Sequence, residues 1–395
     1  MILDPTVALR DLVRIPSVNP MGGEGSGPEF GEARLTDHLE SLLKAMGLPC
    51  QRETVHPGRD NLVVRLDGNP LPGRQGKTVL FGVHQDTVPV AGMTVEPWKA
   101  EIRDGRLYGR GACDVKGGMA AMLSALSRLA DERPGGMPSV VLVCTVNEEY
   151  GFSGAQCLAQ RLRQSGRALP DHVVIAEPTN LDVVVAHKGV VRWRCHALGR
   201  AGHSANPAAG ENAIYKMGRA LAILERYQND VVGALGSHPL CGPATMSVGT
   251  IRGGVSVNTI PDRCTIEIDR RLPPGEDPLG ARQHLIDYVG EHLGPGVAVE
   301  HDPPYMQGPA LSDALNGSLA RRLVEVARQV VPACRPIGVP YATDAAFLAE
   351  LGIPTVVFGP GSVEQAHTAD EWISLEQLDR AAEIFYRFVR AIGDE

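Results

Sequence analysis

The chain has 395 residues and a formal net charge of −8, with 43% hydrophobic and 21% charged residues. This composition is typical of a folded globular protein long enough for two domains, and it excludes a disordered or fibrous chain. The acidic balance argues against nucleic-acid binding, which depends on clustered lysine and arginine. The longest apolar runs are far shorter than the ~20 residues of a membrane span, so we expect neither a membrane nor a nucleic-acid partner.

The cysteines predict a reducing compartment. The chain has eight of them without any Cys-x-x-Cys spacing, and several lie inside apolar runs, as buried free thiols do. The first residues also lack the basic segment and apolar core of a secretory signal. We therefore expect a cytoplasmic protein.

Short apolar runs alternate with helical stretches over much of the chain. Apolar residues at helical spacing predict helices over residues 35–46, 116–132 and 315–330. The apolar runs predict strands over residues 61–66, 78–83, 140–146, 173–176 and 355–358. Continuous apolar strands that alternate with helices indicate an α/β fold with a mainly parallel sheet, covered by helices on both faces.

The middle of the chain has a different pattern. The predicted elements there are a strand at 187–200, a helix at 211–227, strands at 244–251 and 263–271, a helix at 280–293 and a strand at 297–301. This β-α-β-β-α-β order predicts a smaller α+β unit with one open sheet edge. We therefore expect a catalytic domain made of residues 1–184 and 302–395, and an inserted domain over residues 185–301.

Ionisable side chains follow three of the predicted strands. His84 follows the run that begins at residue 78, Glu148 and Glu149 follow the run that begins at residue 140, and Glu177 follows the next. The carboxyl ends of parallel strands share one edge of the sheet, where ligands bind. The pattern thus predicts one histidine and three carboxylates at one rim.

Two aspartates near this rim are interpreted with it. Asp114 lies just before the helix predicted from residue 116, where a carboxylate alone would only stabilise the helix N-terminus. Beside His84 and Glu149 we interpret it as a metal ligand. Asp86 lies two residues after His84, on the same side of an extended chain. We expect its carboxylate to hydrogen-bond the imidazole and fix the tautomer, as carboxylates do for metal-bound histidines.

The pair Glu148–Glu149 is a stronger signal. Two adjacent carboxylates at a buried strand end repel each other unless a cation or a proton neutralises them. Because successive side chains diverge, one carboxylate can bind metal while the other faces a substrate water. The alternative, two solvated glutamates in a loop, stays open at this point. Oxygen ligands with imidazoles suit Zn²⁺, Co²⁺ or Mn²⁺, and we expect Cys113 to pack inward rather than ligate.

Eight short motifs extend this interpretation. They are LFGVHQD (80–86), GRGACDVKGG (109–118), NEE (147–149), AEPT (176–179), GHSANP (202–207), VNTIP (257–261), GPG (359–361) and AHTADE (366–371). In this order they resemble the motifs of the co-catalytic zinc amidohydrolases, a family that includes acetylornithine deacetylase, succinyl-diaminopimelate desuccinylase, aminoacylase and carboxypeptidase G. The resemblance spans almost the whole chain.

The resemblance implies two divalent metal ions per chain, zinc or alternatively cobalt. One ion would be held by His84, Asp114 and Glu177. The other would be held by Asp114, Glu149 and His367, so that Asp114 bridges the two at the ~3.5–4 Å separation of two-metal sites.

The resemblance also implies roles outside the ligand set. Glu148 would be the general base, and the inserted domain would form the contact of a homodimer. His203 would then reach the active site of the partner subunit and hydrogen-bond the developing oxyanion. Arg271 would hold a free carboxylate of the substrate, with Asn258 as a neutral partner, and Gly359 would allow close approach of the backbone.

The implied reaction is metal-dependent hydrolysis of an N-acyl amino acid to a carboxylate and a free amino acid, with Asp86, Glu148 and His203 as catalytic residues. Within the family the chain is most similar to acetylornithine deacetylase. Asp344 departs from that pattern, which usually has a glutamate there, and is closer to the glutamate-releasing carboxypeptidases and desuccinylases. The alternatives are therefore a succinyl-diaminopimelate desuccinylase or a broader aminoacylase or glutamate-releasing carboxypeptidase.

Other classes of protein fit the sequence less well. No Gly-x-Ser-x-Gly elbow of a serine hydrolase is present. Gly109-x-Gly111 lacks the third glycine of a dinucleotide-binding motif. A metal-binding dimerisation protein without activity is the non-enzyme alternative, and an intact base at Glu148 argues against it.

Overall fold

A computed structural model describes residues 2–23, 25, 27–73, 76–294 and 296–393, and it divides into two units. Unit 1 contains the chain up to Val185, Ser312–Gly338 and the chain from Thr343 onward, and unit 2 contains Ala186–Leu311 and Val339–Ala342. The sequence placed the end of the insertion at residue 301, which is too early. The difference arises because β17 (Met306–Gly308) pairs with β9 (Gly189–Leu198) and so extends the sheet of unit 2.

Unit 1 is built on an eight-stranded mixed sheet in the order β1-β2-β6-β3-β7-β19-β8-β18. The strands are β1 (Cys50–His56), β2 (Arg59–Leu66), β3 (Thr78–His84), β6 (Ser139–Thr145), β7 (His172–Ile175), β8 (Val183–His187), β18 (Pro336–Val339) and β19 (Thr355–Val357). The four strands β6, β3, β7 and β19 are parallel, as predicted. The sheet is mixed because β1 and β2 form an antiparallel hairpin that joins β6, and β8 runs antiparallel to β19.

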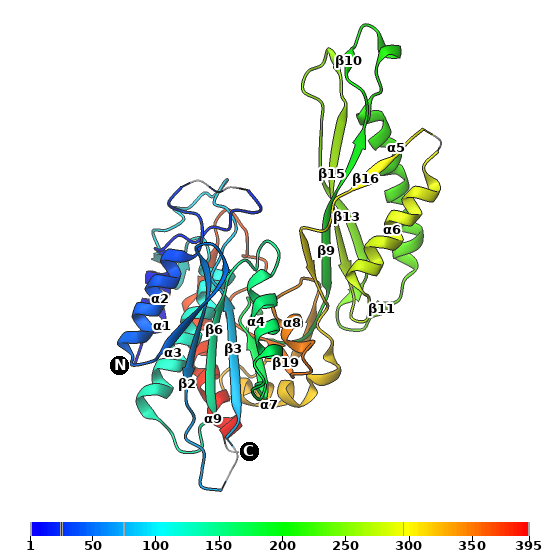
Figure 1. Cartoon of the computed structure of the whole chain (residues 1–395). Helices are drawn as coiled ribbons and strands as arrows, with labels where there is room; N and C mark the ends of the chain where they lie inside the picture. The colour runs from blue at the N-terminus through cyan, green and yellow to red at the C-terminus, as the bar shows by residue number, and fades with distance from the viewer. Residues whose placement is uncertain (1, 24, 26, 74–75, 295, 394–395) are drawn as a thin grey trace. The chain divides into compact units, whose positions relative to one another are not determined.

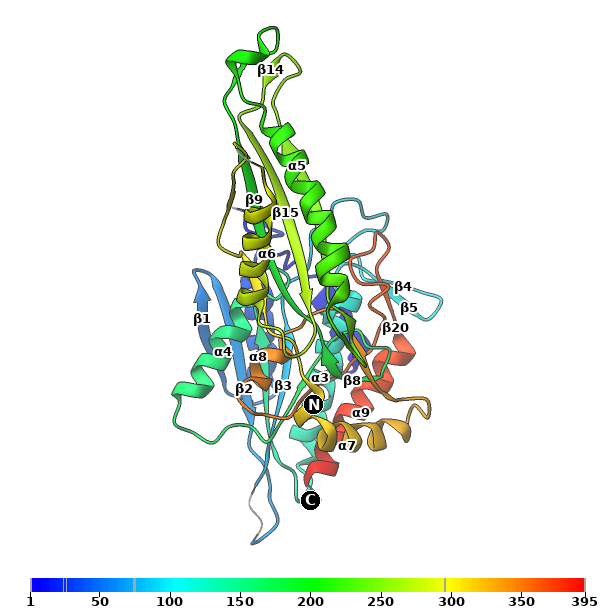
Figure 2. The same cartoon turned by 90° about the vertical axis from the view of Figure 1, so that its right-hand side faces the viewer.

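Helices lie on both faces of this sheet. On one face α1 (Pro5–Val13), α3 (Gly117–Glu132) and α9 (Leu375–Gly393) pack together, and α4 (Ser153–Gln164) and α8 (Ala345–Ala349) lie on the other (Figures 1 and 2). Phe385 of α9 meets the rings of Phe81 and Phe358 at centroid distances of 5.3 and 5.5 Å. The remaining helices of this unit include α2 (Ala33–Ala45) and α7 (Gly317–Arg328).

Unit 1 also contains several shorter elements. They are β4 (Glu101–Arg103), β5 (Arg106–Tyr108) and β20 (Trp372–Ser374), which form a three-stranded sheet, and the π-helix η1 (Ala112–Lys116) before α3.

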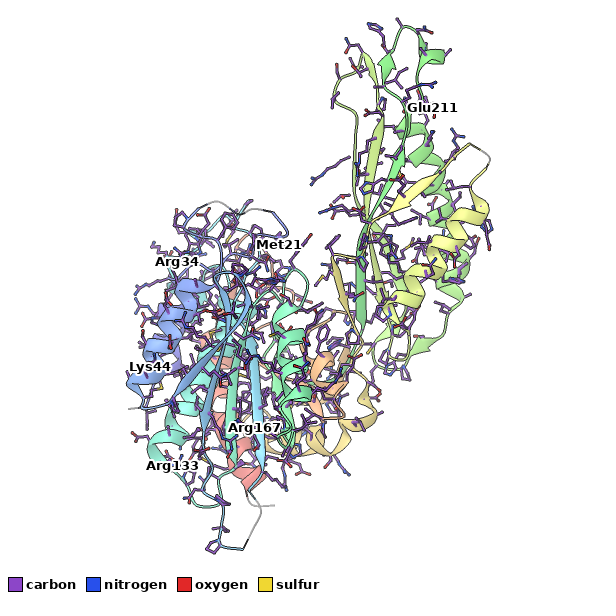
Figure 3. All side chains as sticks on the ribbon, viewed as in Figure 1. Met21, Arg34, Lys44, Arg133, Arg167 and Glu211 are labelled. Carbon is purple, nitrogen blue, oxygen red and sulfur yellow. The ribbon has the colours of Figure 1, made fainter. Side chains whose placement is uncertain are left out.

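Exposed cationic side chains are spread along unit 1. Arg34 and Lys44 lie on α2, Arg133 directly follows α3 and Arg167 follows α4 (Figure 3).

Unit 2 has an antiparallel sheet in the order β13-β15-β9-β16, with β17 also paired to β9. Its other main elements are α5 (Ala213–Arg226), β13 (Thr245–Gly253), β15 (Arg263–Leu272), α6 (Pro278–His292) and β16 (Val299–His301). This order matches the predicted β-α-β-β-α-β pattern. Trp193 and the apolar faces of both helices form a core separate from that of unit 1.

Among the described residues, no helix combines the length and the apolar character needed to cross a bilayer. All eight cysteines are free thiols.

Candidate metal centre

The ends of three parallel strands bring the predicted ionisable residues together. His84 is the last residue of β3, Glu148 and Glu149 follow β6, and Glu177 follows β7. Because β6, β3 and β7 are neighbours that run in the same direction, these ends lie at one edge of the sheet. All four residues are buried, with relative exposures of 3, 8, 9 and 5%.

Two loops complete the cluster. Asp114 lies in η1, and His367 lies between β19 and β20. One ligand atom each from His84, Asp114 and Glu177 lie within 4.8 Å of one another, and the same holds for Asp114, Glu149 and His367. We call these the first and second ligand sets. The structure thus brings together all five residues that the resemblance implied as ligands.

Asp114 is shared by the two sets in a specific way. Its Oδ1 lies 3.1 Å from His84 Nε2, and its Oδ2 lies 3.3 Å from His367 Nε2. The same His367 nitrogen is 3.3 Å from Glu149 Oε2, and His84 Nε2 is 3.9 Å from Glu177 Oε1. Each oxygen of Asp114 therefore faces a different imidazole, which is the arrangement that a bridging carboxylate requires.

The electrostatics of this buried, carboxylate-rich cluster favour the binding of positive charge. Burial raises the pKa of Glu148, Glu149 and Glu177, and the neighbouring carboxylates raise it further. Burial also acts to raise the pKa of Asp114, but hydrogen bonds with His367 and His84 outweigh it and lower the pKa. Hydrogen bonds to Asp114 and Glu149 raise the pKa of His367 to about 10. A buried set of oxygen and imidazole donors that attracts protons in this way fits divalent cations of the zinc type.

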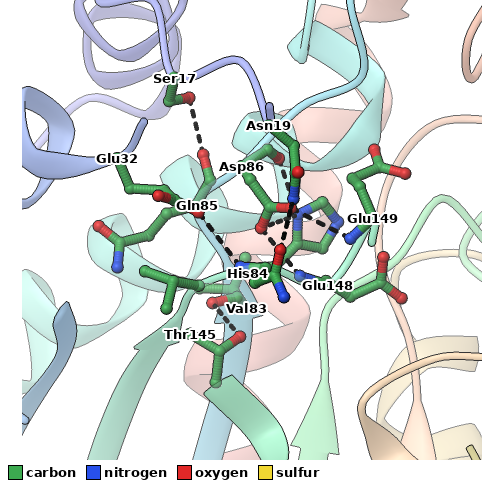
Figure 4. Close-up of polar contacts among 12 residues, drawn as sticks. Ser17, Asn19, Glu32, Val83, His84, Gln85, Asp86, Thr145, Glu148 and Glu149 are labelled. Atoms are coloured by element: carbon green, nitrogen blue, oxygen red, sulfur yellow. Dashed lines mark hydrogen bonds and ion pairs between the residues drawn. The ribbon is translucent and has the colours of Figure 1, made fainter. Parts of the chain in front are cut away.

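Asp86 differs from the sequence-based expectation. His84 Nδ1 donates to the backbone carbonyl of Asp86 at 2.9 Å, whereas the nearest carboxylate oxygen of Asp86 is 3.7 Å away. The carboxylate instead accepts the backbone N–H groups of Glu148 and Glu149, both at 3.1 Å (Figure 4). The expectation was wrong because β3 ends at His84, so the alternation of an extended strand no longer applies two residues later. Asp86 therefore orients the imidazole through its backbone and the two glutamates through its side chain.

Sequence reasoning missed the polar residues around Asn147. This asparagine has a φ of +63°, and its N–H donates to Glu32 Oε1 at 3.2 Å. Asn19 Nδ2 donates to Asp86 Oδ2 at 2.7 Å (Figure 4). The same Nδ2 group donates to Asn147 Oδ1 at 3.0 Å. Asn19 and Glu32 lie in segments without a metal-ligand pattern, so no local signal marks them.

Gly359 has a packing role in the structure. A Cβ atom at this position would lie 2.6 Å from the backbone oxygen of Glu177, and the Gly359 N–H donates to Thr179 Oγ1 at 3.0 Å. The glycine therefore lets the segment after β19 pass directly against the backbone of a ligand residue.

The other predicted substrate residues lie in unit 2. His203 is in β10 (Gly202–His203), which pairs with β14 (Thr259–Ile260), and the N–H of Ser204 donates to the carbonyl of Asn258 at 3.0 Å. His203 Nδ1 accepts the N–H of Ala205 at 3.1 Å, so Nε2 carries the hydrogen of the neutral ring. His203 and Asn258 are thus exposed neighbours.

Arg271 lies near the end of β15 in the same unit. Its Nε donates to Asp269 Oδ1 at 2.8 Å, and its side chain is 24% exposed. The adjacent Arg270 is fully buried and forms an ion pair with Glu276. The two arginines therefore point to opposite sides of the strand, with Arg271 on the accessible side.

Comparison with known proteins identifies the family. Residues 80–391 match the family described as Peptidase family M20/M25/M40. The chain belongs to this family. Acetylornithine deacetylase from Myxococcus xanthus is 32% identical over 90% of this chain and 91% of that protein. Acetylornithine deacetylase from Vibrio cholerae is 31% identical over the same shares.

Solved structures share the fold. A tripeptidase from Staphylococcus aureus superimposes with a TM-score of 0.76 at 22% identity over 100% of both chains. A dinuclear metal-binding M20 peptidase from Bacillus subtilis has a TM-score of 0.64 at 17% identity, over 98% of this chain and 97% of that one. With the ligand sets of this chain, the family membership makes it a hydrolase of small molecules that cleaves amide bonds by metal-dependent chemistry.

Proposed function

We propose that this M20 peptidase family member removes the acyl group from an N-acyl amino acid, with N-acetylornithine as its substrate. The observation that carries the proposal is the pair of buried ligand sets that share Asp114. The relatives named acetylornithine deacetylase match this chain over nine-tenths of its length, which supports the choice of substrate.

The residues fit two divalent ions, zinc or alternatively cobalt. The first ligand set would hold one ion and the second ligand set the other. When bound, such a pair acidifies water and polarises the carbonyl of the scissile amide. The backbone carbonyl of Asp86 holds the His84 ring so that Nε2 faces the first set. The carboxylate of Asp86 holds Glu149 toward the second.

Glu148 is proposed as the general base. Its side chain belongs to neither ligand set, although it is buried at the same rim and adjacent to Glu149. A carboxylate oxygen of Glu148 would take the proton of the attacking water and return it to the leaving amine. The N–H of Glu148 is held by Asp86 at 3.1 Å, which limits the movement of the segment during proton transfer.

Residues of unit 2 are proposed to complete the site in a homodimer. β13 is an edge strand, and exposed apolar side chains lie on it and on the loop after it, with Ile251 54%, Val255 92% and Val257 100% exposed. In the dimer, the Nε2–H of His203 would bind the developing oxyanion in the partner subunit's site. Arg271 and Asn258 would bind the carboxylate of the substrate. The free thiols support a cytoplasmic location.

Asp344 supports a second candidate substrate class. Its buried carboxylate accepts Thr145 Oγ1 at 2.6 Å, directly at the end of β6. The aspartate at this position, where acetylornithine deacetylases usually have a glutamate, favours a succinylated substrate or a glutamate-terminated amide.

A substrate panel tests the proposal. The metal-loaded protein is assayed with N-acetylornithine, N-succinyl-diaminopimelate, N-acetylmethionine and a glutamate-terminated amide. We expect the highest kcat/KM with N-acetylornithine. A higher value with another member of the panel would refute the substrate while leaving the chemistry intact. Hydrolysis of none of them by a protein that binds two ions would support the metal-binding dimerisation protein instead.

A further inference from the structure

Glu371 is a buried carboxylate with an unusual number of hydrogen-bond donors. The residue is 0% exposed. Oε2 accepts Arg110 Nη1 at 2.7 Å and the N–H of Gly111 at 3.0 Å. Oε1 accepts the N–H groups of Cys113 at 2.8 Å and Asp114 at 3.0 Å. One side chain therefore binds three backbone N–H groups of the loop that carries Asp114.

The same residue is tied to His367 through the backbone. Glu371 lies four residues after His367 and directly before β20, which pairs with β5. Its carbonyl accepts the N–H of Gly109 at 3.0 Å, and the carbonyl of Ala369 accepts the N–H of Thr94 at 2.8 Å. The segment that carries His367 is thus joined to the segment that carries Asp114, although about 250 residues separate them in the sequence.

The loop around Asp114 needs such an acceptor. Asp114 and Val115 have non-helical backbone angles inside η1, so their segment does not continue the hydrogen bonds of α3. Without Glu371, the N–H groups of Gly111, Cys113 and Asp114 would be buried donors that lack these partners. A buried donor without a partner is unfavourable, so the loop would move to satisfy these N–H groups.

We propose that Glu371 is a positioning residue. It holds the loops of Asp114 and His367 together so that both side chains can act as ligands of the second set. This inference rests on the ligand sets of the proposed function. Glu371 itself contributes no ligand atom to either set. It acts by fixing the two loops that supply two of the three ligands.

The two sets depend on Glu371 to different degrees. In the first set, His84 and Glu177 come from the ends of β3 and β7, and only Asp114 lies on the loop held by Glu371. In the second set, only Glu149 closely follows a strand of the central sheet, whereas Asp114 and His367 lie on the two segments joined by Glu371. We therefore expect loss of Glu371 to weaken binding of the second ion more than binding of the first.

The test measures metal binding by Glu371→Gln, which keeps the size of the side chain but turns an NH₂ group toward backbone donors. Zn²⁺ or Co²⁺ alone is titrated into the metal-free protein against a competing chelator, and bound Co²⁺ is followed by its absorption spectrum. We expect two ions per chain in the wild type. In E371Q, we expect one ion to bind within a few-fold of wild-type affinity and the other about 10–100-fold more weakly, as for other residues that orient metal ligands.

A matched control separates positioning from the general loss of a buried carboxylate. Glu53 on β1 is 7% exposed and bonded to Arg161 Nη1 at 3.0 Å, and it belongs to neither ligand set. We expect E53Q to bind both ions as the wild type does. Far-UV circular dichroism checks that each variant is folded. If E371Q does not fold, E371D decides: its carboxylate is one methylene shorter, and we expect an intermediate weakening of one ion.

The outcomes distinguish the two proposals. A folded E371Q that binds both ions with wild-type affinity, or an E53Q that weakens one ion equally, would overturn the role of Glu371. The same holds for an E371D with wild-type affinity for both ions where E371Q does not fold. A wild-type chain that binds no ion would instead remove the proposed function on which the role depends.

Discussion

At the scale of single residues, the directions of two adjacent side chains separate the proposed general base from a proposed metal ligand. Glu148 and Glu149 are adjacent and both are fixed through their N–H groups by Asp86. Only Glu149 reaches the second ligand set. The divergence of successive side chains is the reason that we propose different tasks for these two chemically equal carboxylates.

This division predicts the effect of Glu148→Gln. The amide cannot take a proton from water, so we expect kcat to fall by about 10²–10⁴-fold, the usual contribution of a general base. Metal content measured by elemental analysis should stay at the wild-type value, because no ligand is removed. E148Q with near-normal turnover would show that another group is the base.

Asp114→Ala is expected to have the opposite signature. Asp114 faces an imidazole of each ligand set, at 3.1 and 3.3 Å. Its removal takes a ligand from both ions, so we expect both to be lost together in a chelator titration. Retention of one ion at wild-type affinity would contradict the bridging arrangement.

At the scale of elements, a buried histidine at the end of a strand makes the free energy of unfolding depend on pH in the acid range. His187 ends β8 and is completely buried. Burial lowers its pKa from an ordinary 6.5 to about 4, and its hydrogen bond to the Lys188 carbonyl only partly opposes this. The folded chain thus binds fewer protons at this site than the unfolded chain between pH 6.5 and 4. Its contribution to stability is complete above pH 6.5 and is lost as the pH falls toward 4.

His187→Gln tests this linkage. Glutamine does not titrate, so we expect the free energy of unfolding in urea to fall less between pH 7 and pH 4 in H187Q than in the wild type. The difference should reach at most ~3 kcal/mol, from 1.36 kcal/mol per pKa unit. H292Q, which changes the exposed His292 of α6, is the control for loss of a histidine at the surface. Identical pH dependence in H187Q and the wild type would refute the assignment.

At the scale of the whole molecule, the proposed homodimer rests on the edge of unit 2. Ile251 and Val257 expose apolar area on and beside an edge strand, which is a common place for another chain to pair. We expect light scattering to give twice the chain mass for the wild type and a single-chain mass for the double variant I251K/V257D. L71K changes an exposed leucine of unit 1 and should leave the mass unchanged. A wild-type protein with the mass of one chain would contradict the dimer.

Prediction from sequence worked best where structure is local. The strands that lead to His84, Glu149 and Glu177 were identified from short apolar runs, and the runs coincide with β3, β6 and β7 within one or two residues. β1 was missed because its residues are largely polar, and its strand conformation depends on pairing with β2. The domain end at residue 301 was wrong for the same reason, since β17 is defined by its partner β9.

The sequence by itself determined the strand ends that carry ionisable groups, because apolar periodicity is a property of neighbouring residues. The place of Asp114 beside His84 and Glu149 indicated a ligand there, and the motifs indicated the family and, through it, His367. Only the tertiary structure decided that the carboxylate of Asp86 binds the backbone of two glutamates and that Glu371 joins two loops. These contacts connect segments that are distant in the chain, and their hydrogen bonds form only once the sheet has brought the segments together.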